Sequence, residues 1–355
     1  KRAIWCPLYG LETFDKLFTP RQLVALTTFS DLVAEARERA LADAHAAGLP
    51  EGEGIADGGR GARAYADAVA TYLAFPVGRA ADYWSSIATW YPANQQISHT
   101  FTKQAIPMAW DFAEANPFSN SSGGWKSLLA TTIDAFRGFS NFAGIGDVEQ
   151  IDASSSLKKI TNPLISTDPP YYSNIGYADL SDFFYIWLRR SLHKLYPNIF
   201  STILVPKDRE VIASPYRFNG DRTAAKEFFE KNLSKAFSIM SCSASGSFPI
   251  SIFYAFKQSE EQSNSKNYLH EDNTQMSYLS STGWETMLES LLGADLIITG
   301  TWPMSSEQHH RMIAHGTNAL ASSIVLVCRP RPDDAPLGTR KEFLSALRRE
   351  LPEAL

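Results

Sequence analysis

The feature that most constrains the fold of this chain is an alternation of short apolar segments with amphipathic helical segments after Asp147. Strands are short and rich in β-branched and aromatic residues, whereas helices carry apolar residues three or four positions apart. On these criteria we expect strands within 147–155, 162–168, 247–257, 296–302 and 322–330, and helices within 177–196, 220–240 and 282–293. This order predicts an α/β fold with a mainly parallel sheet, covering helices and a closing pair of strands that can pair antiparallel.

The first third of the chain has a different pattern. Residues 19–47 and 63–91 carry apolar residues at helical spacing, with glycines and a proline between them and an interruption expected at Pro76. We therefore expect a mostly helical region over 1–125, the α/β domain over 126–335 and the start of a further helical segment over 336–355. The chain opens on Lys1 and closes within a helical pattern, so both ends are expected to be internal points of a longer protein.

Composition limits the classes of protein that this chain can represent. The 355 residues carry a formal net charge of −5, which disfavours a uniformly basic nucleic-acid binder but is compatible with a local basic face. No apolar run is long enough to span a bilayer, so no membrane partner is expected. Cys6, Cys242 and Cys328 do not form a metal-ligand cluster or a disulfide framework, so we expect no metal and a cytoplasmic location.

The most informative short stretch is STDPPYYSN, residues 166–174, at the end of one expected strand. Open α/β sheets bind ligands beyond the carboxyl ends of their strands, which is where Asp168 is expected. Pro169 and Pro170 fix φ, lack backbone N–H groups and push Asp168 away from helical geometry. The sequence therefore predicts a stiff loop that offers a carboxylate, carbonyl oxygens and the ring of Tyr171 to a planar amine. A plain structural turn is the alternative.

The residues Asp168-Pro169-Pro170-Tyr171 resemble the catalytic motif of S-adenosylmethionine-dependent amino methyltransferases that modify adenine or cytosine in DNA. Four longer blocks, 102–118, 166–192, 282–304 and 318–331, together resemble the adenine-specific DNA methylases that carry an inserted zinc ribbon. The resemblance implies a Rossmann-like methyltransferase sheet, which makes 126–335 part of a catalytic domain. The glycine-rich cofactor motif and the zinc ribbon of that family have no counterpart in this sequence, so the chain alone is expected to bind S-adenosylmethionine weakly.

By this resemblance, Asp168, Pro169, Pro170 and Tyr171 form the catalytic loop of an enzyme that methylates N6 of adenine. The Asp168 carboxylate and the Pro169 carbonyl are expected to hold the exocyclic amine of a base flipped out of DNA, while Tyr171 stacks on that base. The amine attacks the methyl group of S-adenosylmethionine directly. Neither a metal nor a covalent enzyme intermediate is needed, so positioning supplies most of the catalysis.

Two acidic residues are candidate cofactor contacts. Asp168 is one, and the other is Asp152, which ends the strand expected at 147–155, although a capping or turn role fits Asp152 about as well. The sequence FAGIG at 142–146 contains a Gly-x-Gly pattern, but a segment that itself reads as a strand follows it, so a simple turn is favoured.

Basic residues near the catalytic loop in sequence are candidate DNA contacts. Arg189, Arg190 and Lys194 lie on the helix expected at 177–196, and Lys207 follows it. With Tyr171 as the stacking partner, these cations are suited to DNA phosphates, whereas a solvated helix face is the alternative.

The block AWDFAEANPF, 109–118, has no role that the sequence reveals. We expect Trp110 and Phe112 in the core and the acids Asp111 and Glu114 along the cofactor pocket. The aromatic stripe Phe183, Phe184 and Trp187 falls on the apolar face of its helix and is expected to be core rather than a platform for bases.

Several other functions fit the same residues. N4 methylation of cytosine stays open because the motifs of adenine and cytosine enzymes overlap. Methylation of a protein glutamine or an RNA base is disfavoured, because such enzymes commonly carry Asn where this chain has Asp168. A catalytically silent DNA-binding or assembly subunit of a phage-defence or restriction-modification system is the alternative from a different class, with other subunits of that system as partners.

Overall fold

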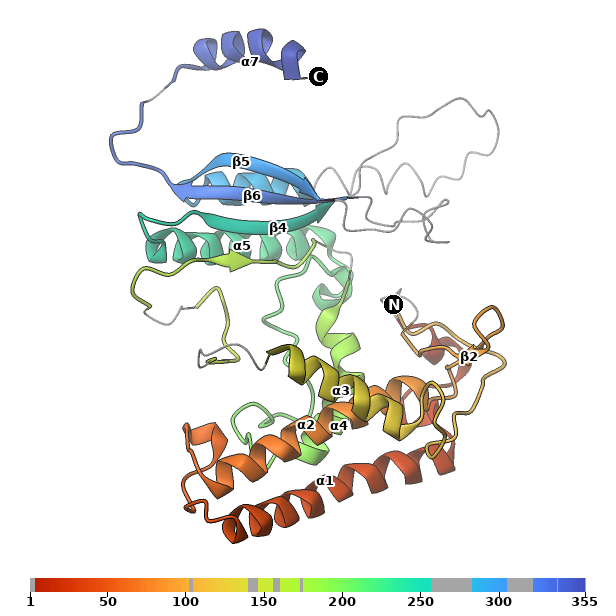
Figure 1. The fold of residues 1–355 in the computed structure, drawn as a ribbon. Helices are drawn as coiled ribbons and strands as arrows, with labels where there is room; N and C mark the ends of the chain where they lie inside the picture. Colours follow the sequence, from red (N-terminus) through yellow and green to blue (C-terminus); the bar gives the residue numbers. More distant parts are fainter. Residues whose placement is uncertain are drawn as a thin grey trace. The chain divides into compact units, whose positions relative to one another are not determined.

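The structure, a computed structural model of the chain, describes residues 4–101, 105–139, 146–155, 160–172, 175–256, 283–304, 322–336 and 338–354. Its contacts divide the chain into two compact units, which Figure 1 shows as ribbons. The first unit contains Lys1–Gln150 and Asn174–Glu210, and the second contains Ile151–Ser173 and Val211–Leu355. Each unit is therefore built from two separate stretches of sequence.

The division differs from the expected boundary after residue 125. The helix that begins at Trp125 and the segment Asn174–Glu210 both belong to the first unit, together with the first hundred residues. The mostly helical part of the molecule is therefore larger than expected, and the sheet is assembled from the rest. As functional domains, 1–125, 126–335 and 336–355 stay predictions.

The first unit is a helical assembly. Its long helices are α1 (Pro20–Ala46), α2 (Ala62–Tyr83), α3 (Trp125–Phe139) and α4 (Tyr177–Leu192), and α2 packs against each of the other three. Its short elements are η1 (Cys6–Tyr9), η2 (Phe14–Leu17), η3 (Ile55–Asp57) and the antiparallel pair β1 (Trp90–Tyr91) and β2 (Gln96–Ile97).

Local signals explain where α1 begins. Thr19 precedes the helix with extended geometry, its hydroxyl accepts from Gln22 N, and Gln22 Oε1 accepts from Thr19 N at 2.8 Å. This reciprocal capping box satisfies two donors at the helix start. The interruption expected at Pro76 is wrong, because α2 continues through it. Pro76 is buried among packed helices, and that packing offsets the backbone hydrogen bond that proline cannot make.

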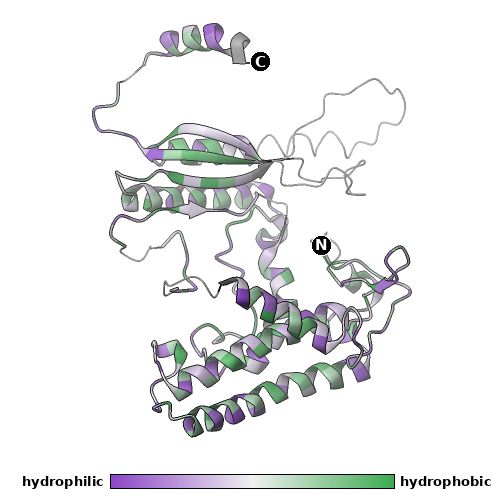
Figure 2. Ribbon diagram, in the orientation of Figure 1, coloured by the Kyte–Doolittle hydropathy of each residue, from purple (hydrophilic) through white to green (hydrophobic). Residues whose placement is uncertain are grey.

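The core of the first unit depends on small residues in α2 and aromatic residues in α4. Along α2 the buried small side chains include Ala66, Ala70, Ala74, Ala80 and Ala81, which allow neighbouring helices to approach closely. The aromatic stripe of α4 is core, as predicted: Phe183 and Trp187 are buried, and Phe184 packs against the same cluster. Figure 2 shows that hydrophobic and hydrophilic positions also alternate along α1.

The second unit contains the sheet and its helices. The strands are β3 (Ser166–Thr167), β4 (Ile250–Phe256), β5 (Leu296–Met304) and β6 (Ser322–Pro330). The helices are η4 (Pro215–Phe218), α5 (Arg222–Ser243), a helix over 283–292 and α7 (Arg340–Ala354). Asp221 caps α5 through bonds from Thr223 N and Ala224 N, and α7 begins with a capping box between Thr339 and Glu342.

The strand order is β3-β4-β6-β5, with β3 parallel to β4 and with β6 antiparallel to both of its neighbours. It follows that β3, β4 and β5 all run in one direction and that only β6 is reversed. The antiparallel closing pair expected at 296–302 and 322–330 is therefore confirmed, and so is a mixed α/β architecture.

One face of the sheet carries the core of the second unit. Ile250, Ile252 and Tyr254 alternate along β4, so their side chains lie on the same face, and all three are buried. They form one cluster with Phe229 of α5 and Met287 of the helix over 283–292. The two helices thus cover this face.

Two expectations about extended structure need correction. Residues 147–155 form no strand; they are irregular and end in a turn at 153–155. The segment contains four polar residues among its first six and pairs with no strand among the described residues. Its few apolar positions were therefore not enough to make it a strand. The strand expected at 162–168 is reduced to Ser166–Thr167. None of the helices in the described ranges is long and apolar enough to cross a membrane.

Candidate active site

The candidate catalytic loop leaves the sheet at the carboxyl end of β3. Ser166 and Thr167 pair with Ser251 and Ile252 of β4, and Ser251 N donates to Ile165 O at 3.0 Å. The ladder ends there, because neither residue after Asp168 has an N–H group to donate. Since β3 and β4 are parallel, the loop lies at the edge of the sheet where both carboxyl ends emerge.

Asp168 presents its side chain to solvent. The residue is exposed, and it forms no ion pair with any residue that the structure describes. Its Oδ1 accepts a hydrogen bond of 2.8 Å from the Tyr171 hydroxyl, which orients the carboxylate. Pro169 is buried and Pro170 is partly buried, so the loop is anchored directly behind the exposed acid. The arrangement provides a fixed hydrogen-bond acceptor at a sheet edge.

The ring of Tyr171 is held by a second tyrosine. Its centroid lies 5.5 Å from that of Tyr254, with an interplanar angle of 82°, an edge-to-face contact. Tyr254 also lies 5.8 Å from Trp284 and donates to Gly283 O at 3.4 Å. Burial raises the pKa of Tyr254 to about 12, with a smaller contribution from Tyr172. The tyrosine of the motif is thus fixed by the sheet from one side and bonded to Asp168 from the other.

Tyr172, which follows the motif, adopts an uncommon backbone conformation. Its φ is 33°, a value that L-residues rarely adopt. Its ring packs edge-to-face on Phe229 at 5.1 Å, and its carbonyl accepts from Ala213 N at 2.9 Å. Gly283 faces it so closely that an added Cβ at Gly283 would lie 3.0 Å from the Tyr172 Cβ. Sequence reasoning missed Tyr172 and Gly283; the doubled tyrosine was the only available signal.

Asp152 is a turn residue in this structure. Its Oδ1 accepts from Ser154 N at 2.8 Å and from Ser154 Oγ at 2.7 Å, while its carbonyl accepts from Ser155 N at 3.0 Å. Asp152 and Asp168 both belong to the second unit. The bonds to Ser154 favour the turn interpretation, and a cofactor contact by Asp152 stays a prediction.

The candidate DNA-binding cations lie in the first unit, whereas Asp168 lies in the second. Arg189 Nε donates to the carbonyls of Phe200 and Thr202. Arg190 forms a two-pronged bond to Asp31 of α1, at 3.0 and 2.9 Å. These contacts tie α4 to the adjacent loop and to α1, which is a structural role.

Lys207 is held by contacts within the protein, whereas Lys194 is exposed to solvent. Lys207 Nζ pairs with Asp182 of α4, which is buried, and it also donates to Val205 O at 3.1 Å. Lys194 is exposed just beyond the end of α4. Of the four cations, Lys194 is therefore the one most open to a phosphate, and the DNA contacts as a group stay predictions.

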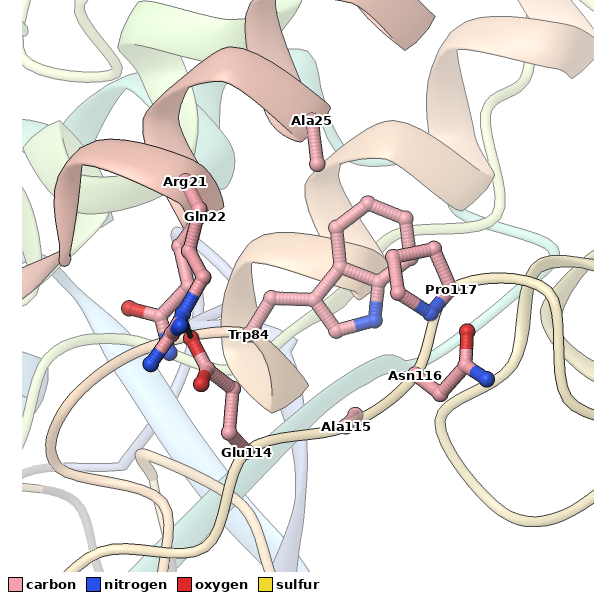
Figure 3. A pocket seen from close by; sticks show the side chains of 8 residues that line it. All are labelled: Arg21, Gln22, Ala25, Trp84, Glu114, Ala115, Asn116 and Pro117. Atoms are coloured by element: carbon pink, nitrogen blue, oxygen red, sulfur yellow. Dashed lines mark hydrogen bonds and ion pairs between the residues drawn. The ribbon is translucent and has the colours of Figure 1, made fainter.

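The block 109–118 is an irregular segment that contacts the start of α1 through Glu114. The core positions expected for Trp110 and Phe112 are wrong: Trp110 is 79% exposed and Phe112 is 38% exposed. Glu114 instead turns its carboxylate to α1, where Oε1 accepts from Arg21 Nε at 2.8 Å and from Thr19 Oγ1 at 3.2 Å. The segment forms a cavity of about 310 Å³ with α1 and Trp84. Figure 3 shows the side chains that line it.

Parts of the sequence-based site lie outside the described residues. They are Phe142 to Ile145 of FAGIG and Thr282, the first residue of the helix expected within 282–293. Comparison of the chain with protein-family models, with curated proteins and with solved structures gave no match. The chemistry of the site therefore rests on its residues and their geometry.

Proposed function

We propose that this chain is the catalytic part of an S-adenosylmethionine-dependent methyltransferase that acts on the exocyclic amine of adenine in DNA. The observation that carries the proposal is the loop Asp168–Tyr171, which leaves a parallel strand at its carboxyl end with an exposed carboxylate oriented by Tyr171. The sequence of the loop supplies the resemblance, and the position of the loop suits a ligand site of an α/β sheet.

The sheet gives the proposal further support. Strands β3, β4 and β5 run in one direction, and β6 is inserted in reverse between β4 and β5. The Rossmann-like methyltransferase sheet that the resemblance implies is expected to close with an antiparallel pair of this kind. We therefore infer that the second unit is the carboxyl-terminal part of such a sheet.

The residues of the loop suit the two partners of the reaction. The Asp168 carboxylate, with Oδ1 bonded to Tyr171, keeps Oδ2 as an acceptor for an amine N–H, and the Pro169 carbonyl is a second acceptor. A carboxylate next to an aromatic ring also fits a sulfonium cation. When bound, S-adenosylmethionine supplies an electrophilic methyl group on sulfur.

The chain's own contribution is to position the amine. Two acceptors that take the amine hydrogens direct the nitrogen lone pair away from the loop, toward the incoming methyl carbon. A nitrogen–carbon bond forms as the carbon–sulfur bond breaks, the sulfonium becomes a neutral thioether, and the methylated amine releases one proton to water. A base can reach Asp168 only after it leaves the duplex stack, so DNA must present it flipped out.

The test is Asp168→Ala in the natural protein that contains this chain, assayed by transfer of labelled methyl groups to unmethylated DNA. We expect activity to fall by about 100-fold or more, because positioning supplies most of the rate, while thermal unfolding is unchanged since Asp168 is exposed. Glu35→Gln, at an exposed acid of α1 in the first unit, is the matched control and should retain activity. Near-normal activity of Asp168→Ala would remove the site assignment.

A second measurement separates the role of the chain from that of the cofactor motif that the resemblance places elsewhere. Calorimetry on the isolated chain should show weak binding of S-adenosylmethionine. Micromolar affinity would place cofactor residues within the chain, with FAGIG as the first segment to mutate. Oligonucleotides that carry only adenine or only cytosine as the methylatable base decide between N6 and N4 transfer.

A further inference from the structure

A buried glutamine amide in the first unit has no hydrogen-bond partner. Gln22 is 4% exposed and its Oε1 caps Thr19 N, but among the described residues its Nε2 bonds to nothing. A buried amide donor without a partner is destabilising, so an uncompensated one is rare in native proteins. A donor left in this state inside a cavity wall indicates that something else accepts its hydrogen bond.

Gln22 lies in the wall of the cavity formed by α1, Trp84 and the segment 114–117. Figure 3 shows Gln22, Arg21 and Glu114 together at one end, and the indole of Trp84 with the ring of Pro117 at the other. Trp84 Nε1 donates to Gly123 O at 2.7 Å, so the indole offers the cavity apolar surface only. The cavity therefore has a polar end and an apolar, ring-lined end.

Glu114 provides an acceptor at the polar end. Its Oε1 is shared by Thr19 Oγ1 and Arg21 Nε, and no described residue bonds to its Oε2. The Glu114 side chain is 29% exposed, and its charge is balanced by Arg21. The polar end thus combines an unused donor, Gln22 Nε2, with an unused acceptor, Glu114 Oε2.

We propose that this cavity binds an amino-substituted nucleobase. A ring nitrogen of the base accepts from Gln22 Nε2, the adjacent exocyclic amine donates to Glu114 Oε2, and the ring packs between Trp84 and Pro117. Adenine and cytosine both present such an edge, and stacking on an aromatic side chain is a common way to hold a base. The ion pair at the polar end favours a neutral ligand, since an anion would face the Glu114 carboxylate.

The size of the cavity limits the ligand. A volume of about 310 Å³ is at the lower end of the range for small-molecule sites, about 300–1,000 Å³. One base or nucleoside is therefore accommodated, and the base can come from a free nucleoside or from a nucleic-acid strand. The proposal concerns the first unit only and does not depend on the function proposed for the Asp168 loop.

The test measures binding of adenosine and of purine riboside to the chain by calorimetry. Purine riboside has the same ring system and keeps the ring acceptor N1, but it carries hydrogen in place of the amine, so it cannot donate to Glu114. We expect adenosine to bind about tenfold more tightly than purine riboside, the value of one hydrogen bond. A single-stranded adenine oligonucleotide, measured in parallel, shows whether a base within a strand binds more tightly than the nucleoside.

Two variants separate binding from folding. Gln22→Met removes the donor and should weaken adenosine binding about tenfold. Since it also removes the cap of Thr19, its circular dichroism and thermal melt must show a folded chain. Glu114→Gln leaves the helix cap intact and should remove the preference for adenosine over purine riboside. Glu35→Gln, on α1 but outside the cavity wall, is the control and should bind as the unmodified chain does.

The outcomes are distinct. A preference for adenosine that Glu114→Gln removes, in folded protein, supports the site whichever source of base binds more tightly. Equal affinity for adenosine and purine riboside in the unmodified chain overturns the proposal, and so does adenosine binding that neither variant changes. Absence of saturable binding of all three probes overturns it as well.

Discussion

The hydroxyl of Tyr171 offers the most direct test of how the candidate catalytic loop is held. Tyr171→Phe removes the 2.8 Å bond to Asp168 Oδ1 and keeps the ring that packs 5.5 Å from Tyr254. Hydrogen bonds to charged groups contribute about 1.5–3 kcal/mol, and the exposure of Asp168 moves this bond to the lower end or below, about 1 kcal/mol. We expect methyl transfer to slow about fivefold, because a loss of about 1 kcal/mol corresponds to that factor in rate.

The assay is single-turnover methyl transfer with unmethylated DNA, with the free energy of unfolding measured on the same preparations. Stability should change by less than about 0.5 kcal/mol, because the aromatic ring and its burial are retained. Tyr171→Leu, which loses the ring as well, should be slower and less stable. Unchanged activity of Tyr171→Phe would show that the bond does not orient the acid during the reaction. Increased activity would show that the bond holds Asp168 away from its substrate, and our reasoning would be wrong.

Three further predictions concern the second unit and the cysteines. Phe237→Ala, at a fully buried position of α5, should lower the free energy of unfolding by about 3–5 kcal/mol in urea denaturation. Because folding raises the pKa of Tyr254 from 10.0 to about 12, its stabilising effect is complete below pH 10 and is lost as the pH rises toward 12. That loss amounts to about 2–3 kcal/mol and should be absent in Tyr254→Phe. A disulfide reagent at pH 8 should label Cys242 quickly and Cys6 and Cys328 only on unfolding, because the latter two are buried and burial raises the pKa of each thiol.

The sequence predicted those elements whose signals are local. The start of α1 follows from Thr19 and Gln22, which cap it, and α4 lies within the predicted range 177–196. The order of β4, the helix over 283–292, β5 and β6 was also correct. In each case, side-chain periodicity and end signals agree, so little depends on distant contacts.

Features that depend on distant contacts were missed. Pro76 stays inside α2 because packing overrides the local preference of proline, and Trp110 is exposed although its residue type predicts burial. The bond between Arg21 and Glu114 joins residues 93 positions apart, so neither the cavity nor the unpaired Gln22 amide has a signature in the sequence. The exposed Asp168 loop was found because its residues carry a recognisable motif, whereas the support it receives from Tyr254 and Gly283 was not.

The reversed strand β6 has a consequence for biosynthesis. Strand β6 pairs with Ile250–Phe256 on one side and with Leu296–Met304 on the other. It is nevertheless the last of these strands to leave the ribosome. Until residue 330 has emerged, β4 and β5 expose unpaired edges that other chains can join. A premature stop just upstream of Ser322 should therefore yield an aggregating product rather than a smaller folded one, and the sheet should assemble only late in translation.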